Sequence, residues 1–381
     1  MKQLSRFYIL LLALLLPALA SAFDFQVDGI CYNINGNEAT VTSKGDYYDM
    51  FFVGYLGAVV IPPTVTYYGI TYPVTAIDEI AFYCCEGLTS IDIPSSITKI
   101  GDFAFGNCPA LTSIVVESGN PRYDSRDNCN AIIETADNTL IVGCKNTTIP
   151  NSVTTIGNFA FCYCWGLTSI IIPNSVTVIG KCAFEGCIGL TSVEIGNSVT
   201  SIGRYAFYNC QGLTTINIPN SVTEIGNNAF YCCDRLTSIV IPNSVNSIGN
   251  EAFKNCWMLA DVYCYIADLS GVSCGNEQFY KEYNGDYSGR TLHVLQGTAD
   301  AYRADKNWYP YFGRIVDDLI PERPTGDVNG DREVNIADVN AAIDIILNGS
   351  ENPSGDVNGD GEINIADVNA VIDIILGGSC N

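Results

Sequence analysis

Two stretches near the C-terminal end of the sequence, residues 327–338 and 356–367, repeat one pattern of oxygen-bearing side chains. Carboxylates or amides stand at positions 1, 3, 5, 9 and 12 of each stretch, and position 7 can offer its backbone carbonyl. Calcium binds about six to eight hard oxygen ligands, and this spacing wraps a loop around one ion. The two copies therefore predict two bound calcium ions. The candidate ligands are Asp327, Asn329, Asp331, Glu333, Asn335 and Asp338 in the first loop and Asp356, Asn358, Asp360, Glu362, Asn364 and Asp367 in the second.

Both loops depart from the calcium loop of an EF-hand at position 12, which is Asp where the EF-hand has Glu. Position 6 is Arg332 in the first loop and Gly361 in the second. One apolar helical pattern follows each loop, over Val339–Leu347 and Val368–Leu376, and no convincing helix precedes either loop. The alternative is an acidic turn without metal, which the duplication disfavours.

A duplicated unit of one calcium loop and one helix resembles the type I dockerin of cellulosome proteins, over residues 326–377. Aspartate at loop position 12 is typical of that family. Dockerins bind cohesin modules, so the resemblance implies a partner that carries a cohesin. For Ile343 and Ile372, packing between the helices is an equal alternative to recognition. The recognition positions that the resemblance implies are Ile336, Ala337, Ile343 and Asp344 in the first copy and Ile365, Ala366, Ile372 and Asp373 in the second.

A second pattern, IGxxAFxxCxxLTSIxIPNSVTx, repeats through the middle of the chain. A fixed period with apolar residues at fixed offsets predicts a solenoid, in which each coil is stable only against its neighbours. With the opening Ile as position 1, copies begin at Ile77, Ile100, Ile156, Ile179, Ile202, Ile225 and Ile248.

Each offset of the repeat predicts a local structure. The apolar residues at positions 12, 15 and 17 alternate with polar ones, which predicts a short strand that pairs in parallel with the next coil. The segment A-F-x-x-C predicts a short helical turn with Phe and Cys in the core. Glycine at position 2 predicts a positive φ. The buried phenylalanine column would contain Phe82, Phe105, Phe161, Phe184, Phe207, Phe230 and Phe253.

These repeats resemble the bacterial surface leucine-rich-repeat proteins of the BspA type, over about residues 59–264. The resemblance implies surface display and binding to host or matrix proteins. The predicted fold class is thus a leucine-rich-repeat solenoid, β-rich with parallel strands and short helical turns, followed by a small α-helical dockerin with two EF-hand-like calcium loops.

The chain divides into segments with different patterns. Residues 1–22 have a basic start, an apolar core and small residues before Phe23, which predicts a secretory signal peptide cleaved near Ala22. No other segment is long enough to span a membrane. The further expected segments are an N-terminal cap over 23–58, the solenoid over 59–265 with an insertion at about 118–148, a C-terminal cap over 266–319, a linker over 320–325 and the dockerin over 326–378.

The composition limits the possible partners. The net charge is −23, and residues 326–381 contain eleven acidic residues and one arginine. Nucleic acids and anionic membranes need a basic surface, so both are disfavoured as partners. No C-x-x-C pair appears among the 17 cysteines, which disfavours zinc. The cysteines of repeat position 9 are expected to be buried and reduced. Cysteines outside repeat position 9 are better candidates for disulfides: Cys129, Cys144, Cys264 and Cys274.

No set of residues predicts catalysis. Gly271, Ser273 and Gly275 match a hydrolase motif, with Asp286 and His293 downstream, but the interval is too short for the required βα units. Strand position 16 varies among Asp92, Val115, Ile171, Glu194, Asn217, Val240 and Tyr263, which favours binding over catalysis. Exposed contacts and edge packing are equal alternatives for a set of aromatic residues: Tyr163, Trp165, Tyr208, Tyr231 and Trp257.

Two functions remain. The favoured one is a secreted or surface-displayed scaffold that binds an unknown protein through its repeats and docks through a calcium-dependent dockerin to a cohesin-bearing partner. The alternative is a non-catalytic accessory of a polysaccharide-degrading assembly, whose repeat face binds glycans through the aromatic residues.

Overall fold

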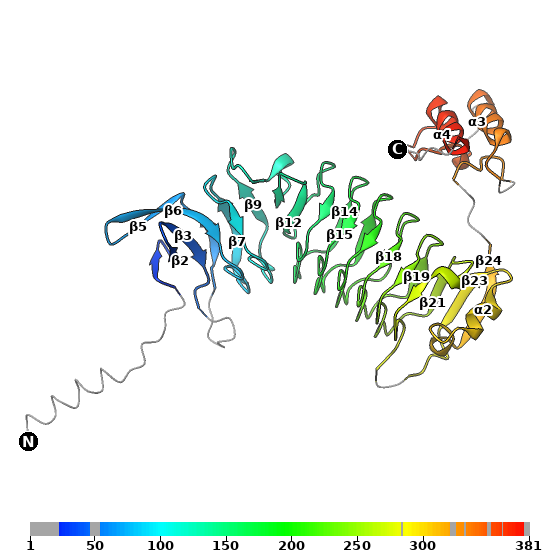
Figure 1. The fold of residues 1–381 in the computed structure, drawn as a ribbon, viewed down its shortest axis with the longest axis horizontal. Helices are drawn as coiled ribbons and strands as arrows, with labels where there is room; N and C mark the ends of the chain where they lie inside the picture. The colour runs from blue at the N-terminus through cyan, green and yellow to red at the C-terminus, as the bar shows by residue number, and fades with distance from the viewer. Residues whose placement is uncertain are drawn as a thin grey trace, which may run out of the picture. The chain divides into compact units, whose positions relative to one another are not determined.

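The computed structural model describes residues 23–45, 54–282, 285–320, 325–330, 333–348, 352–359 and 361–376. The chain forms two compact units that divide between Leu319 and Ile320. The larger unit is a row of stacked coils with a cap at each end, and the smaller unit contains two helices (Figure 1). This arrangement confirms the predicted fold class. The predicted signal peptide, residues 1–22, lies outside the described residues.

A mostly antiparallel sheet caps the first coil. Its first three strands form an antiparallel meander, and β3 then pairs in parallel with β6, which leads into the repeats. Phe25, Tyr32 and Val41 on this sheet are buried in one core with the first coils, so the cap shields the open end of the stack. Its strands are β1 (Phe25–Val27), β2 (Ile30–Asn35), β3 (Glu38–Thr42), β5 (Thr64–Tyr67), β6 (Ile70–Ile77) and β8 (Lys99–Ile100).

The L-T-S-I-x-I stretch of the repeat forms strands that pair in parallel between coils, as predicted. In β14, Ile170 and Ile172 are buried while Ser169 and Ile171 are exposed. Residues 214–218 occupy the same place in their coil without being assigned to a strand. The strands of this ladder form three successive sheets: β4 (Gly57–Val60), β7 (Leu88–Ile93) and β9 (Ser113–Val116); β14 (Ser169–Ile172) and β16 (Ser192–Ile195); and β19 (Ser238–Ile241), β21 (Asp261–Cys264), β23 (Thr291–Leu295) and β24 (Arg314–Leu319).

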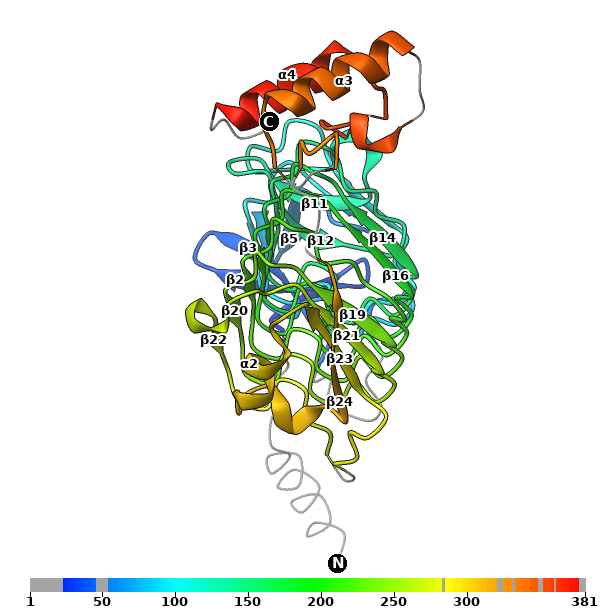
Figure 2. The same ribbon diagram turned by 90° about the vertical axis from the view of Figure 1, so that its right-hand side faces the viewer.

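A second parallel ladder, which the repeat pattern did not predict, runs along the other side of the coils (Figure 2). Each regular coil contributes only two residues to it, so the alternation is too short to read from sequence. The antiparallel strands of the insertion start this ladder. Its strands are β10 (Tyr123–Asp124), β11 (Ala131–Glu134), β12 (Thr139–Gly143), β13 (Thr155–Ile156), β15 (Val178–Ile179), β17 (Ser201–Ile202), β18 (Glu224–Ile225), β20 (Ser247–Ile248) and β22 (Ser273–Cys274).

The phenylalanines of the repeat are all buried, as predicted. From Phe161 to Phe253 each ring stacks on the next, with centroids 5.0, 5.1, 5.3 and 5.2 Å apart. Phe279, beyond the last regular repeat, extends the column at 5.2 Å. Phe82 and Phe105 form a separate stacked pair in the first coils. The prediction of one continuous column is therefore wrong, because the insertion divides the column and the core in two.

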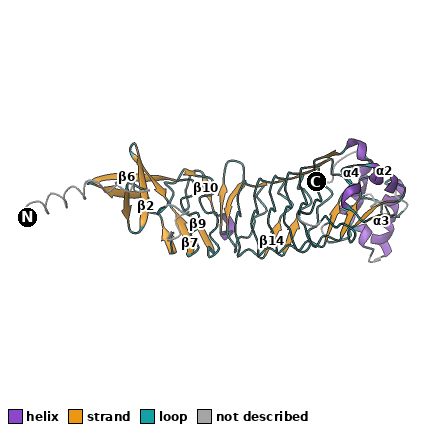
Figure 3. Cartoon of the chain, turned by 90° about the horizontal axis from the view of Figure 1, so that it is seen from below, coloured by secondary structure: helices purple, strands orange, loops and turns teal. Residues whose placement is uncertain are grey.

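The predicted helical turn at A-F-x-x-C is wrong, because this segment forms non-helical turns (Figure 3). Positions 4 and 8 of the coils have a positive φ, for example 61° at Phe159 and 56° at Tyr163. This backbone aims alternate N–H groups at the next coil, where Phe161 donates to the carbonyl of Ala183 over 2.7 Å. Hydrogen bonds between coils thus replace those of a helix.

The prediction of a positive φ for the glycine at position 2 is also wrong. These glycines are needed for space. A Cβ added to Gly203 would lie 2.7 Å from the main-chain carbon of Gly180, and one added to Gly249 would lie 2.3 Å from the nitrogen of Asn227. Such distances are shorter than any real Cβ contact, so glycine lets the backbones of adjacent coils touch.

Sixteen cysteines of the described chain are free thiols. The position-9 cysteines are buried, as predicted. The disulfides expected among Cys129, Cys144, Cys264 and Cys274 are absent from this part of the chain. The Cys264 thiol lies 3.1 Å from the Tyr302 hydroxyl, and Cys144 donates to the carbonyl of Asn130 over 3.4 Å. Polar partners within the fold therefore satisfy these two thiols.

The C-terminal cap adds β23 and β24 to the first ladder and covers the last coil with α2 (Ala299–Ala304). A 3₁₀ turn follows this helix at Tyr309–Tyr311. The buried Arg290 guanidinium donates to three main-chain carbonyls at the end of the stack, and burial lowers the pKa of Arg290 to about 10. Those carbonyls belong to Cys256, Leu259 and Phe279.

The smaller unit packs α3 (Ile336–Asn348) against α4 (Ile365–Ile375). Val339, Ala342 and Ile345 of α3 meet Val368 and Val371 of α4 in a small buried core. A 3₁₀ turn at Pro353–Gly355 precedes the second loop. One helix accompanies each acidic loop, as predicted, but each begins at position 10 of its loop, three residues before the predicted starts at Val339 and Val368.

Candidate functional site

The last residue of each acidic loop, near the start of the helix, accepts hydrogen bonds from main-chain N–H groups of its own loop. In the first loop, the N–H groups of Val328 and Asn329 donate to Oδ1 of Asp338 over 2.8 and 3.0 Å, and Asn335 donates to Oδ2 over 2.9 Å. Burial acts to raise the pKa of Asp338, but these N–H donors outweigh it and hold the pKa below its usual range. The Asp338 carboxylate is therefore charged at neutral pH.

The second loop repeats this geometry. Val357 and Asn358 donate to Oδ1 of Asp367 over 2.8 and 3.1 Å, and Asn364 donates to Oδ2 over 2.8 Å. The Asn364 side chain in turn accepts from the N–H of Ala366, which caps α4. The two loops therefore close in the same way, as expected of a duplicated site.

The first residue of each loop also accepts main-chain N–H groups. Gly330 donates to Oδ1 of Asp327 over 2.7 Å, and Gly359 and Gly361 donate to the two oxygens of Asp356 over 2.8 and 3.0 Å. Gly361, at loop position 6, has a φ of 86°. The matching residue of the first loop, Arg332, lies outside the described residues, as do the position-5 ligands Asp331 and Asp360.

The chemistry of the two loops fits calcium. Asp327, Asp338 and Asp367 are buried carboxylates, and the described residues of the smaller unit include no Lys, Arg or His to balance them. Every predicted ligand is an oxygen donor, as calcium requires. Among the described residues, which do not include Asp331 and Asp360, no three His, Cys, Asp or Glu side chains converge as a metal cluster. A divalent ion would neutralise these buried charges.

The predicted recognition residues lie on the exposed side of the two helices. Ile336 and Ile365 are 67% and 66% exposed, and Ile343 and Ile372 are both 36% exposed. Ile343 and Ile372 are still largely covered at this exposure, so partner recognition and packing between the helices both remain predictions for these two residues. The remaining predicted positions are also exposed: Ala337, Asp344, Ala366 and Asp373.

Two exposed leucines extend this surface, and the sequence analysis did not predict them as part of it. Leu347 and Leu376 are 76% and 78% exposed, one helical repeat beyond Ile343 and Ile372. The signal was available, because Ile336, Ile343 and Leu347 follow one helical stripe. Each helix thus has one apolar stripe in the core and a second that faces solvent. We call the exposed stripes the helix faces, defined by residues 336, 337, 343, 344 and 347 and by 365, 366, 372, 373 and 376.

The larger unit carries two further candidate surfaces. The position-16 side chains point outward from the first ladder, with Ile171 and Val115 64% and 46% exposed. On the turn side, a groove of about 620 Å³ is lined by Tyr163, Tyr208, Tyr231 and Glu185, among others. We call it the tyrosine groove.

Aromatic contacts shape the tyrosine groove. Tyr208 stacks on Tyr231 with ring centroids 5.1 Å apart, and the Tyr163 hydroxyl donates to Glu185 over 3.0 Å. The three tyrosines are half-buried, so each presents part of its ring to the groove. Trp165 and Trp257, 39% and 38% exposed, do not line it.

The residues of the hydrolase-like motif do not assemble. His293 lies 2.8 Å from Asp318 and 3.2 Å from Asp261, and its ring stacks on Tyr263. Asp286 instead accepts from the N–H of Ser288. The histidine is thus held on the strand surface by its neighbours in the ladder.

Comparisons with protein families match both units. Residues 64–129 and 141–262 match the BspA type leucine rich repeat region in six copies. Residues 325–376 match the dockerin type I domain. Both modules are typically non-catalytic, and no catalytic domain is detected. A comparison with curated proteins found no match.

Three similar solved structures come from bacteria, and two of them are described as leucine-rich proteins. A leucine rich cell surface protein from Faecalibacterium prausnitzii is 22% identical, with 63% of this chain and 94% of that chain covered and a TM-score of 0.41. The pneumococcal vaccine antigen PcpA is 16% identical, with 77% of this chain and 98% of that chain covered and a TM-score of 0.47. A leucine-rich repeat protein from Bacteroides ovatus is 22% identical, with 77% of this chain and 100% of that chain covered and a TM-score of 0.27.

None of the helices in the described parts of the chain is long and apolar enough to cross a membrane. The family matches agree with the stacked coils of the larger unit and with the paired loops and helices of the smaller one. The chain is a BspA-type leucine-rich-repeat solenoid followed by a type I dockerin, a module that typically binds calcium and implies docking to a cohesin.

Proposed function

We propose that this protein is a secreted or surface-displayed binding scaffold, docked to a cohesin-bearing partner through a C-terminal unit that holds two calcium ions. The first ion would be held by Asp327, Asn329, Asp331, Asn335 and Asp338 with the carbonyl of Glu333, and the second by the matching residues of the other loop. Calcium would supply charge neutralisation and a fixed loop shape. The protein itself supplies the binding surfaces.

One observation carries this proposal: equivalent isoleucines of the two helix faces have nearly equal exposure, at 67% and 66% and at 36% and 36%. Exposed apolar stripes on a soluble unit indicate a partner. The acidic residues Asp344 and Asp373 lie beside these stripes, at the expected rim of an interface. A partner could therefore engage either face after a half-turn.

The experiment is a binding measurement between the mature protein and a panel of purified type I cohesins, in millimolar calcium and again in excess chelator. We expect binding to at least one cohesin in calcium and none in chelator. Far-ultraviolet circular dichroism on the same samples reports whether the helices fold. Equal binding in both conditions, or no binding to any cohesin, would contradict the proposal.

The alternative function, a glycan-binding accessory of a polysaccharide-degrading assembly, is favoured by the tyrosine groove. Half-buried tyrosine rings beside a carboxylate can stack on sugar rings and accept their hydroxyls. A glycan array and an array of extracellular proteins, probed with the same labelled protein, separate the two functions. Loss of glycan signal in Tyr208→Ala, with Trp257→Ala unchanged, would support the alternative, and glycan signal that survives Tyr208→Ala would count against it.

A further inference from the structure

On the turn side of the coils, main-chain N–H groups at repeat positions 4, 6 and 8 donate to carbonyls of the following coil. Phe184 donates to Ala206 over 2.7 Å, and Phe207 donates to Ala229 over the same distance. In the rungs between regular repeats the residue that accepts from the phenylalanine is a buried alanine, and in the last rung, where Phe253 donates, it is Gln278. We call one such set of donors and acceptors a rung.

The insertion interrupts these rungs between residues 101–108 and 157–164. The coil between these two segments contributes β12, which fills only part of the space between them. The N–H of Gly143 donates to the carbonyl of Ala160 over 2.8 Å, and no A-F-x-x-C turn follows it. One rung is therefore incomplete at this point of the stack.

The interruption leaves main-chain groups unpaired. Within the described residues, the N–H groups of Phe103 and Phe105 have no acceptor, and the carbonyl of Asn158 has no donor. In the same part of the chain, one main-chain hydrogen bond crosses the gap: Asn107 donates to the carbonyl of Cys162 over 3.3 Å. Unpaired main-chain groups are costly in a buried setting, and Phe105 is only 7% exposed.

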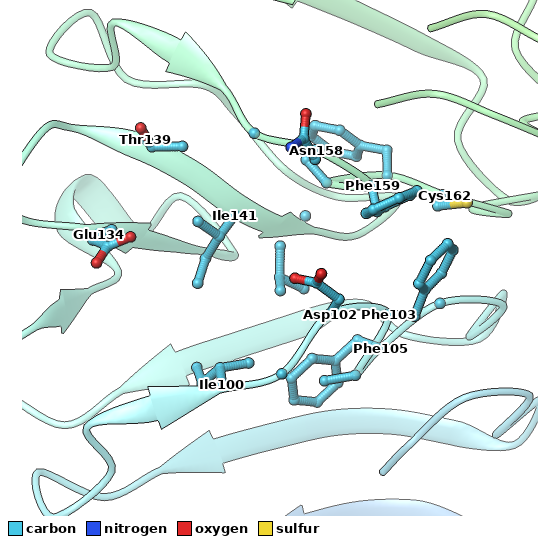
Figure 4. Close-up of a pocket in the computed structure, with 18 of the residues that line it drawn as sticks. Ile100, Asp102, Phe103, Phe105, Glu134, Thr139, Ile141, Asn158, Phe159 and Cys162 are labelled. Carbon is cyan, nitrogen blue, oxygen red and sulfur yellow. The ribbon is translucent and has the colours of Figure 1, made fainter. Parts of the chain in front are cut away.

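A cavity of about 340 Å³ occupies the place of the incomplete rung (Figure 4). Phe105 and Ile141 line it with apolar surface. The Phe103 and Phe159 rings, with centroids 4.0 Å apart, meet across the gap. Of its charged lining residues, Arg122 pairs with Glu134 over 2.8 Å and Asp102 is exposed, so the net negative charge of the lining disfavours an anion as the occupant. Its volume falls within the range of about 300–1,000 Å³ that is typical of ligand sites.

We propose that this cavity binds a short, uncharged peptide segment of a partner protein, which completes the interrupted rung. Two carbonyls of the segment, two residues apart, would accept from the N–H groups of Phe103 and Phe105, and one N–H would donate to Asn158. The residue that bears the second carbonyl must be small, because regular rungs place alanine there. This main-chain recognition follows the logic of strand addition to an open sheet edge. The site goes beyond the docking function of the C-terminal unit.

The test is hydrogen exchange of the Phe103 and Phe105 amides in the mature protein, followed by mass spectrometry or NMR. The probe is the capped peptide acetyl-Ala-Gly-Ala-Gly-Ala-amide. Bound peptide should slow both amides by the factor 1 + [L]/Kd and leave the Phe184 and Phe207 amides unchanged. A second probe with its central amide reduced to a methylene-amine, which removes one carbonyl, should give no protection. This comparison needs no variant of the protein.

A protein-side control fills the cavity. Ile141→Trp should abolish protection, and Ile188→Trp, at an exposed position of another coil, should leave it intact. Protection by sulfate in place of the peptide would identify an anion site and overturn the proposal. Equal protection by the intact and reduced peptides, or none at any peptide concentration, would also overturn it.

Discussion

The thiol of Cys187 donates to the main-chain carbonyl of Phe161, 26 residues earlier, with Sγ and the oxygen 3.1 Å apart. Cys210 makes the same contact with Phe184 over 3.1 Å. The contact thus links the cysteine and phenylalanine columns along the stack. The other pairs are Cys108 with Phe82, Cys233 with Phe207 and Cys256 with Phe230.

Position-9 thiols should therefore be inert in the folded protein. Burial raises the pKa of Cys85 and of Cys164 to about 12, and only the thiolate reacts. We expect iodoacetamide at pH 8 to label these cysteines after denaturation and not before, as counted by mass spectrometry. Half-buried Cys84 and Cys232 provide an internal comparison. Rapid labelling of Cys187 and Cys210 in the native protein would contradict the assigned core.

Truncation of the phenylalanine column should destabilise the larger unit. Phe207 is fully buried between two stacked rings, so Phe207→Ala should lower the free energy of unfolding by about 3–5 kcal/mol. Urea denaturation measures the change. Tyr309→Ala, at a residue that is 59% exposed, should change it by less than about 0.5 kcal/mol. Similar losses in both variants would count against the column.

The repeat glycines should be sensitive to a single methyl group. Gly203→Ala places a Cβ 2.7 Å from the backbone of Gly180, so the coils must separate, at a cost of about 1–3 kcal/mol. Gly271→Ala is the matched control, because a Cβ there would meet nothing within 4 Å. If denaturation shows the same stability for both variants, close backbone contact is not the role of these glycines.

The glycines also show how far the sequence predicts this fold. The period predicted the strands, the phenylalanine column and the stacking of coils, because apolar burial fixes those positions. It did not predict the left-handed residues at positions 4 and 8, where Phe159 and Tyr163 are unusual residue types for a positive φ. Hydrogen bonds between coils impose that backbone, and local propensity cannot reveal a bond to a residue one coil away.

The candidate sites show the same limit. Loop spacing could single out candidate calcium ligands because one short segment contains all of them, and their roles stay a prediction. The tyrosine groove and the incomplete rung combine residues from several coils, so they became visible only once the coils were stacked. Leu347 and Leu376 continue the stripes of Ile343 and Ile372, so the signal was in the sequence, but only the structure shows that these stripes face solvent.

Lys254 should make the stability of the last coils depend on pH. Its ammonium lies 2.8, 3.0 and 3.4 Å from Glu251, Glu277 and Glu282. The hydrogen bond from Lys254 lowers the pKa of Glu251. The ion pair therefore stabilises the folded state fully at a pH above the ordinary carboxyl pKa. This stabilisation is lost as the pH falls through the lowered pKa of Glu251.

Lys254→Met should therefore be less stable than the wild type at pH 7, with a difference that shrinks as the pH falls below about 4.5. Urea denaturation at several pH values measures this difference. Lys306→Met, at an exposed residue, should follow the wild type at each pH. A difference that grows on acidification would show that Lys254 does not stabilise these carboxylates.

Titration calorimetry of a cohesin into the mature protein in calcium tests the docking account most directly. Equivalent helix faces predict that Ala337→Arg alone costs only a factor of two in affinity, or about 0.4 kcal/mol, because the second face remains. Adding Ala366→Arg should abolish binding, while Glu194→Arg on a repeat strand should have no effect. Loss of binding in Ala337→Arg alone would show that the faces are not equivalent, and undiminished binding in the double variant would show that docking does not use them.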